Sequence, residues 1–192
     1  MTRLLSRGLA AFAFVLICAA HIGSPDTWFE GNAGPYRLLV HVRSPGVVPA
    51  IADNFRVSSD GLTYLFRIRE GERWSDGEPL TAEDFAYAWR RMRELETRTA
   101  FLMEDVETAE ALDDRTLEVH LREPRSYFPY VLTSTWAFPW PKHRCEELGD
   151  EWTKPENLVG NGPFVLVEWD KDHALLRANP HWAGAHGNVR EI

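Results

Sequence analysis

The sequence predicts an α+β domain in which short antiparallel strands and a few helices form one mixed layer. Residues 62–69 alternate between apolar and polar side chains, which is typical of a strand with one buried face. Residues 82–94 instead place apolar side chains at helical spacing. Turn-forming dipeptides such as Asp60-Gly61 separate these segments. Strands that alternate with helices and are joined by many hairpins favour a mixed α+β architecture.

The first predicted hairpin joins residues 54–57 to residues 62–69. Asp60-Gly61 lies in the connection, and this dipeptide accepts positive φ at little cost. In the second arm, one face of the strand carries the apolar side chains of Leu62, Tyr64, Phe66 and Ile68. We expect this face to be buried.

The predicted helix over residues 82–94 begins after Thr81. Thr81 is a favourable N-cap residue, and Asp84 follows three residues later, as in a capping box. The helix should bury a stripe of apolar side chains formed by Phe85, Ala88, Trp89 and Met92.

The rest of the chain continues the same alternation of short elements. Gly149 is expected to end one helix, and Asn161-Gly162-Pro163 to form a turn before a final hairpin. We predict strands over residues 106–111, 116–121, 164–169 and 174–178, and helices over residues 127–132 and 142–148. Two prolines stiffen a loop over residues 136–141.

Residues 1–20 have the features of an export signal. Arg3 and Arg7 precede an apolar run over residues 9–20, and Ala19-Ala20 could precede cleavage before His21. Twelve apolar residues are fewer than the roughly 20 that a spanning helix needs. An uncleaved segment that anchors the chain poorly, or a lipid on Cys18, remains an alternative.

Residues 21–49 are rich in Gly and Pro and contain one predicted strand, over residues 37–42. We expect a boundary near residues 46–50, because residues 21–49 are richer in Gly and Pro than the sequence that follows. Residues 50–192 form the predicted main domain.

The charge balance excludes several classes of partner. Without Arg3 and Arg7, 19 basic residues remain against 29 acidic ones, a net charge of −10. Such a charge argues against binding to nucleic acid or to anionic membrane surfaces. After removal of the signal only Cys145 remains, so no internal disulfide can form.

The sequence contains acidic residues but no convincing catalytic or metal site. Asp76, Glu78, Glu83 and Asp84 suggest a hydrolase with paired carboxylates, for example one that acts on polysaccharides. The better interpretation places them in turns and in the first turn of a helix, where negative charge is favourable. No metal-binding motif is present, and we predict no enzyme activity, no metal and no cofactor.

Four ordered blocks of sequence resemble the peptide-binding family, family 5, of ABC-transporter solute-binding proteins. The family includes the oligopeptide- and dipeptide-binding proteins, and the match runs from Val48 to Gly184. The blocks are FRVSSDGLTYLFRIREGERWSDGEPLTAEDFAYAWRR, ALDDRTLEVHL with PRSYF, EWTKPENLVGNGPFVLVEW, and LLRANPHW.

The resemblance implies a partial periplasmic-binding-protein type II fold, made of the accessory subdomain and the edges of the first lobe. It also implies a periplasmic or extracytoplasmic receptor that captures short peptides or similar solutes and delivers them to the permease of an ABC importer. We expect a truncated member of the family, because the second lobe is missing. We also expect a monomer. A remnant or scaffold that binds nothing is the alternative.

Two aromatic residues are the candidate ligand contacts. Trp136 lies in the stiff loop, and Phe101 lies near the position where the family places an aromatic residue after its long helix. The other patterned tryptophans, Trp74, Trp89, Trp169 and Trp182, are expected to pack in the core.

Overall fold

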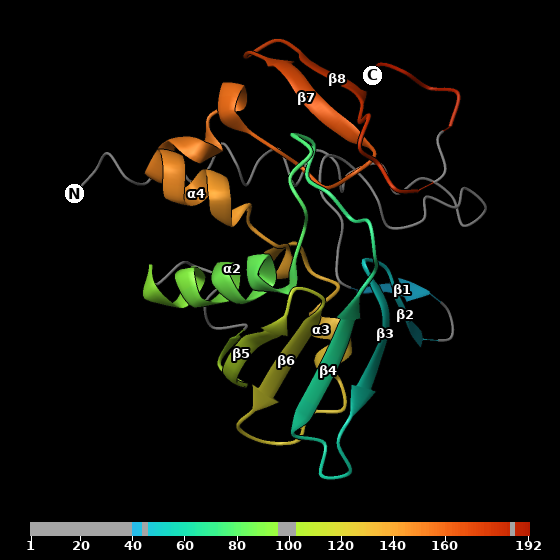
Figure 1. Ribbon diagram of the computed structural model, residues 1–192, viewed down its shortest axis with the longest axis vertical. Coiled ribbons are helices and arrows are strands. Elements are labelled where there is room, and N and C mark those ends of the chain that lie inside the picture. Colours follow the sequence, from blue (N-terminus) through green and yellow to red (C-terminus); the bar gives the residue numbers. More distant parts are fainter. Residues whose placement is uncertain (1–39, 44–45, 96–102, 185–186) are drawn as a thin grey trace.

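The largest sheet of the fold is a four-stranded antiparallel sheet with the order β3-β4-β6-β5 (Figure 1). The structure is a computed structural model that describes residues 40–43, 46–95, 103–184 and 187–192. The strands of this sheet are β3 (Ala52–Val57), β4 (Thr63–Ile68), β5 (Val106–Asp113) and β6 (Thr116–Leu121). In this register Phe55 lies opposite Phe66, and Tyr64 lies opposite Val119.

The alternation in the sequence correctly predicts which face of the sheet is buried. Tyr64, Phe66 and Ile68 on β4 are buried, as are Leu117 and Val119 on β6. Helix α2 (Ala82–Glu94) packs against β5 and β6. The predicted bounds of α2, β6, β7 and β8 agree with the structure, whereas β5 continues two residues beyond its predicted end.

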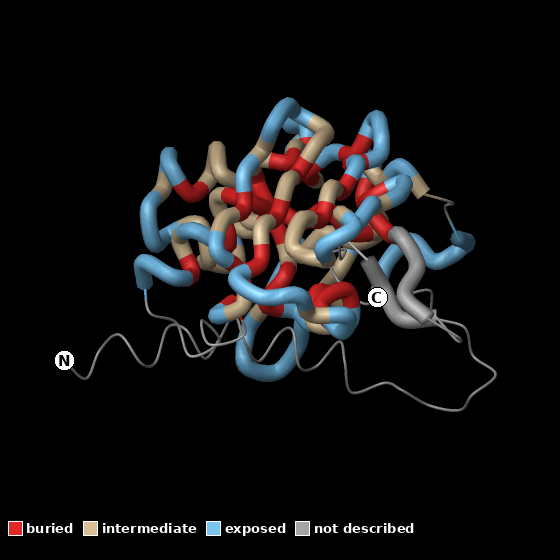
Figure 2. The backbone as a smooth tube through the Cα atoms, turned by 90° about the horizontal axis from the view of Figure 1, so that it is seen from below, coloured by how far each residue is buried: buried red, intermediate tan, exposed pale blue. Residues whose placement is uncertain are grey.

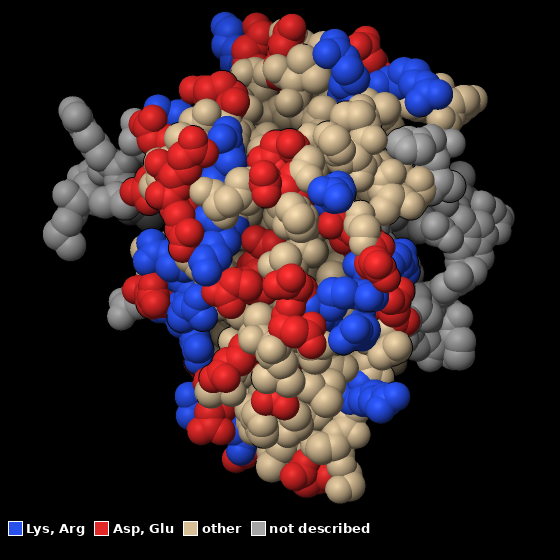
Figure 3. Space-filling view, viewed as in Figure 1, with Lys and Arg blue, Asp and Glu red and all other residues tan. Residues whose placement is uncertain are grey.

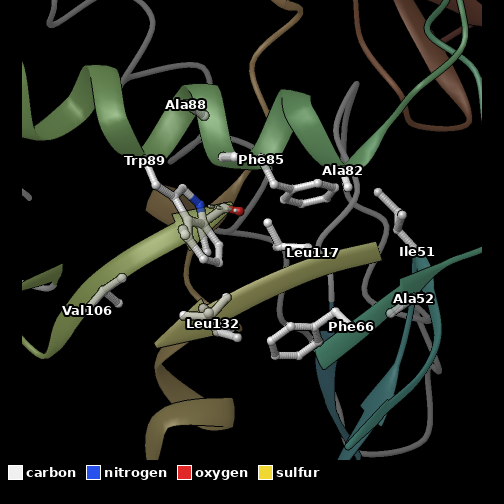
Figure 4. Packing of buried hydrophobic residues seen from close by; sticks show 14 of the residues in the cluster. Ile51, Ala52, Phe66, Ala82, Phe85, Ala88, Trp89, Val106, Leu117 and Leu132 are labelled. Carbon is white, nitrogen blue, oxygen red and sulfur yellow. Dashed lines mark hydrogen bonds between the residues drawn. The ribbon is translucent and has the colours of Figure 1, made fainter. Parts of the chain in front are cut away.

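Helix α2 contributes the apolar stripe that its spacing predicts. Phe85 and Trp89 point from α2 towards the sheet, where Leu117 faces them (Figure 4). Their rings form an edge-on contact with centroids 6.4 Å apart. The described part of the chain therefore has one continuous hydrophobic core between the sheet and the helices, with its buried residues in the interior of the fold (Figure 2).

The chain then passes through several short helical segments. Gly149 follows α4 with a φ of 57°, a conformation that glycine adopts without strain, and so ends the helix as predicted. The segments are α3 (Phe128–Val131), η2 (Thr135–Ala137), α4 (Lys142–Leu148), η3 (Gly149–Thr153) and η4 (Pro155–Asn157).

A second, smaller sheet forms the C-terminal part of the structure. Strands β7 (Phe164–Trp169) and β8 (Ala174–Ala178) make the predicted hairpin. The last residues run beside β8, since the Leu176 N–H donates to the Ile192 carbonyl at 2.9 Å and the Ala178 N–H to the Arg190 carbonyl at 2.8 Å. No residue of β7 or β8 is buried. Trp169 is therefore only half-buried, and the prediction that it packs in the core is wrong.

The N-terminal prediction needs one correction. The structure has a hairpin of β1 (Val40–Arg43) and β2 (Gly46–Pro49), where we predicted a single strand; the domain boundary near residues 46–50 stays a prediction. Gly46 and Pro49 look like breakers of secondary structure, but the two valines between them have high strand propensity. The predicted signal and the start of the predicted strand lie outside the described residues.

Candidate functional site

Trp136 lies in η2 and is a buried residue of the hydrophobic core. Only 7% of its surface is exposed, and its ring packs against that of Trp89 with centroids 6.4 Å apart. Its indole Nε1 is buried and has no hydrogen-bond partner among the described residues. A buried indole N–H usually has an acceptor, so this donor is an exception among the described residues. A ligand-binding role for Trp136 remains a prediction.

Phe101, the second predicted ligand contact, lies outside the described residues. Trp74 and Trp89 are fully buried, as predicted. Trp182 was also expected in the core, but it is only half-buried.

Asp84 is a buried carboxylate that joins three parts of the chain. Its Oδ2 accepts the backbone N–H of Thr81 at 2.8 Å and the indole N–H of Trp74 at 3.3 Å. Its Oδ1 accepts the backbone N–H of Lys142, at the start of α4, at 3.1 Å. Burial raises the pKa of Asp84 above its usual value, although these hydrogen bonds oppose the shift.

The burial of Asp84 was not predicted from the sequence. We predicted a carboxylate in the first turn of α2, where negative charge is favourable, and only 4% of its surface is exposed. The capping box with Thr81 was predicted correctly, and the carboxylate oxygen that accepts the Thr81 N–H also serves Trp74. The nearby tryptophan was the only signal in the sequence that could have indicated this second role.

Of the other three acidic residues of the hydrolase alternative, two contact basic side chains and one is exposed. Glu83 pairs with Arg90 and Lys142, each at 3.1 Å. The Asp76 carboxylate contacts Nε2 of His143 at 2.7 Å, and Glu78 is exposed. These contacts account for the carboxylates as parts of turns and helix ends.

The turn of residues 75–77 connects the region between β4 and α2 to distant segments. The Ser75 N–H donates to the Gly160 carbonyl at 2.7 Å, and the Gly160 N–H donates to Ser75 Oγ at 3.1 Å. Gly77 has a φ of 93°, and a Cβ atom at this position would lie 3.3 Å from two atoms of the His181 imidazole. Three later segments therefore meet at this turn, because His143 also reaches it from α4.

The described residues offer no group of three or more His, Cys, Asp or Glu side chains that could hold a metal ion. The thiol of Cys145 is buried, and desolvation raises its pKa to about 12. A pocket of about 500 Å³ lies beside β8 and the last residues, where Arg177 pairs with Glu191 at 2.8 Å.

The surface has no extended region of one charge on the face that Figure 3 shows, where acidic and basic side chains are interspersed. In the part of the chain that is described, no helix has the length and apolar character needed to cross a membrane.

Comparisons with known proteins agree on one family. Residues 46–192 match the model of the bacterial extracellular solute-binding proteins, family 5 Middle. The chain is 37% identical to the probable deoxycholate-binding periplasmic protein YgiS of Escherichia coli, covering 74% of this chain and 30% of that protein. It is 32% identical to the periplasmic oligopeptide-binding protein OppA of Salmonella typhimurium, covering 75% of this chain and 30% of OppA.

Solved structures give the same result. The crystal structure of Haemophilus influenzae OppA in complex with the peptide RPPGFSPFR superimposes with a TM-score of 0.72 and 31% identity, over 80% of this chain and 34% of that chain. The fold is therefore part of the periplasmic-binding-protein fold of the peptide-binding proteins, and the chain spans about a third of the length of its relatives. The chain belongs to family 5 of the bacterial extracellular solute-binding proteins.

Proposed function

We propose that this chain forms part of the extracytoplasmic receptor of an ABC importer that takes up peptides or similar solutes. The observation that carries the proposal is the family match over residues 46–192, because relatives such as OppA are oligopeptide-binding proteins. The receptor would be exported, would act as a monomer, and would deliver its ligand to permease subunits.

The role we propose is binding and not catalysis. The relatives are binding proteins, and the four clustered carboxylates of this chain lie in turns and helix ends. Asp84 in particular accepts three N–H groups through its two oxygens, which leaves it little capacity to act as an acid or base on a substrate.

Trp136 is the described residue that we propose as a ligand contact. Its buried Nε1 has no partner among the described residues, while the neighbouring Ser134 and Thr135 are exposed. A peptide is rich in backbone carbonyl groups, and a carbonyl is the kind of acceptor that an indole N–H takes.

The experiment is a titration of the purified chain with a mixture of di- to pentapeptides, followed by calorimetry and by tryptophan fluorescence. A saturable signal is expected. Deoxycholate is titrated in parallel, because YgiS is a probable deoxycholate-binding protein. A response to deoxycholate alone would replace the peptide proposal with a bile-acid ligand.

Two matched variants locate the ligand. Trp136→Phe keeps an aromatic ring and removes the N–H, and we expect it to weaken peptide binding. Trp140→Phe is the control, because Trp140 is half-buried and packs in a tilted arrangement against Trp152, with centroids 5.5 Å apart. If the chain is folded but silent with every ligand, the alternative of a scaffold that captures nothing is correct.

A further inference from the structure

The β7–β8 hairpin has little hydrophobic core of its own. All residues of the two strands are half-buried or exposed. Among the described elements, the main contacts of these strands are with each other and between β7 and η4. A two-stranded hairpin is marginally stable in water, so other contacts must hold it against the larger sheet.

The turn of residues 75–77 provides such contacts, and it is itself anchored in the core. Trp74, which precedes it, is fully buried and donates its indole N–H to Asp84. The Trp74 backbone N–H donates to the Glu78 carbonyl at 2.9 Å and so closes the turn. Burial of Trp74 and its bond to Asp84 therefore hold the turn in place relative to the four-stranded sheet.

Each residue of the turn holds a different later segment. Ser75 exchanges two hydrogen bonds with Gly160, just before the turn that leads into β7. Asp76 contacts His143 of α4 at 2.7 Å, and only about a third of each side chain is exposed, at 32% for His143 and 27% for Asp76.

Gly77 supports the segment that follows β8. A Cβ atom at this position would lie 3.3 Å from two atoms of the His181 ring, so the imidazole rests on the bare glycine. Arg73 donates a hydrogen bond to the Gly77 carbonyl at 2.8 Å and so also holds this residue. The backbone N–H of His181 is held by the side chain of buried Asn179, at the end of β8.

We infer that residues 75–77 form a clamp that sets the position of the β7–β8 hairpin relative to the four-stranded sheet. Ser75 contacts the chain just before β7, Gly77 contacts the segment after β8, and Asp76 contacts α4. The β7–β8 hairpin has no buried strand residue. Loss of these contacts should therefore let the hairpin move as a unit while the four-stranded sheet keeps its structure.

The experiment measures the distance between the two sheets with spin labels at Lys171, between β7 and β8, and at Glu110 on β5, both of which are exposed. Cys18→Ser and Cys145→Ala remove the native thiols. The test variant combines Ser75→Ala, His143→Ala and His181→Ala, which removes the side chains that make the contacts between residues 75–77 and all three later segments and leaves the positive-φ glycine intact. Glu147→Ala is the control, because Glu147 is exposed and pairs with Arg144 within α4.

We expect a narrow distribution of distances in the parent and in Glu147→Ala, and a broader or shifted one in the clamp variant. Hydrogen exchange checks the sheet itself: the amides of β4 and β6 should keep their protection while that of Asn179 exchanges faster. An unchanged distribution in the clamp variant overturns the inference. Equal loss of protection in both sheets also overturns it, because the contacts would then serve global stability alone.

Discussion

The indole Nε1 of Trp74 donates a hydrogen bond to the Asp84 carboxylate at 3.3 Å, and both side chains are buried. The bond joins the loop after β4 to the first turn of α2. Because the other carboxylate oxygen accepts the N–H of Lys142, the same aspartate also fixes the start of α4. One buried carboxyl group thus joins these three segments through hydrogen bonds.

Replacement of Asp84 by alanine should strongly destabilise the protein. The variant leaves the Trp74 indole N–H and two backbone N–H groups without their acceptor. Each buried donor left unpaired costs about 1–3 kcal/mol, so we expect a loss of about 3–5 kcal/mol in the free energy of unfolding. Urea unfolding measures it.

Glu83→Gln is the control for this prediction, since Glu83 is the adjacent residue and forms only partly exposed ion pairs. Such pairs contribute about 0–1 kcal/mol. Equal effects of the two substitutions would show that the hydrogen bonds of Asp84 do not stabilise the fold.

The stability that Asp84 contributes should depend on pH. Desolvation raises the pKa of Asp84 above its unfolded value of 3.8, so the folded state binds the proton more tightly than the unfolded state. This contribution is fully present below 3.8 and is lost as the pH rises through the folded pKa. The free energy of unfolding of the wild type, minus that of Asp84→Asn, should therefore increase as the pH falls from neutral into this window.

The Asp84→Asn variant serves as the reference because other carboxylates change the free energy of unfolding with pH in the opposite direction. Hydrogen bonds lower the pKa of Asp60, Asp113 and Asp170, so the stability that they contribute is lost as the pH falls. Both proteins contain these groups, and their effect cancels in the difference. A difference that is constant with pH would contradict the raised pKa of Asp84.

The sequence predicted the local elements well because their signals are local. The alternation around Phe66 and the stripe around Phe85 depend only on neighbouring residues, and the structure buries both as expected. Gly149 ended α4 for an equally local reason, since glycine accepts positive φ. The valine pair of β2 was missed because the flanking Gly46 and Pro49 carry the opposite local signal.

The contacts around the candidate site could not be predicted in the same way. His181 packs on Gly77, and Gly160 bonds to Ser75, across long separations in the sequence. Neither pair has a motif, because each contact depends on how distant segments meet. The burial of Trp136 depends likewise on Trp89 in α2, so its loop position alone suggested a more open environment.

Cys145 should be unreactive in the folded protein. Burial raises the pKa of its thiol from 9.0 to about 12, and only the thiolate attacks alkylating reagents. At mildly alkaline pH the thiolate fraction falls by about 1,000-fold relative to an ordinary thiol, before burial limits access. Iodoacetamide labelling followed by mass spectrometry should modify Cys145 only after unfolding in urea, and rapid labelling of the folded chain would contradict the prediction.

Gly77→Ala should destabilise the protein more than Gly71→Ala. Both glycines have positive φ, of 93° and 82°, so both substitutions introduce backbone strain of about 1–2 kcal/mol. A Cβ at Gly71 meets nothing within 4 Å, whereas at Gly77 it lies 3.3 Å from the His181 ring. The difference between the two variants in urea unfolding therefore measures the contact with His181. Adding His181→Ala to each variant should abolish this difference, because it removes the ring that the new methyl group meets; a difference that persists would place its origin in the backbone of the turn.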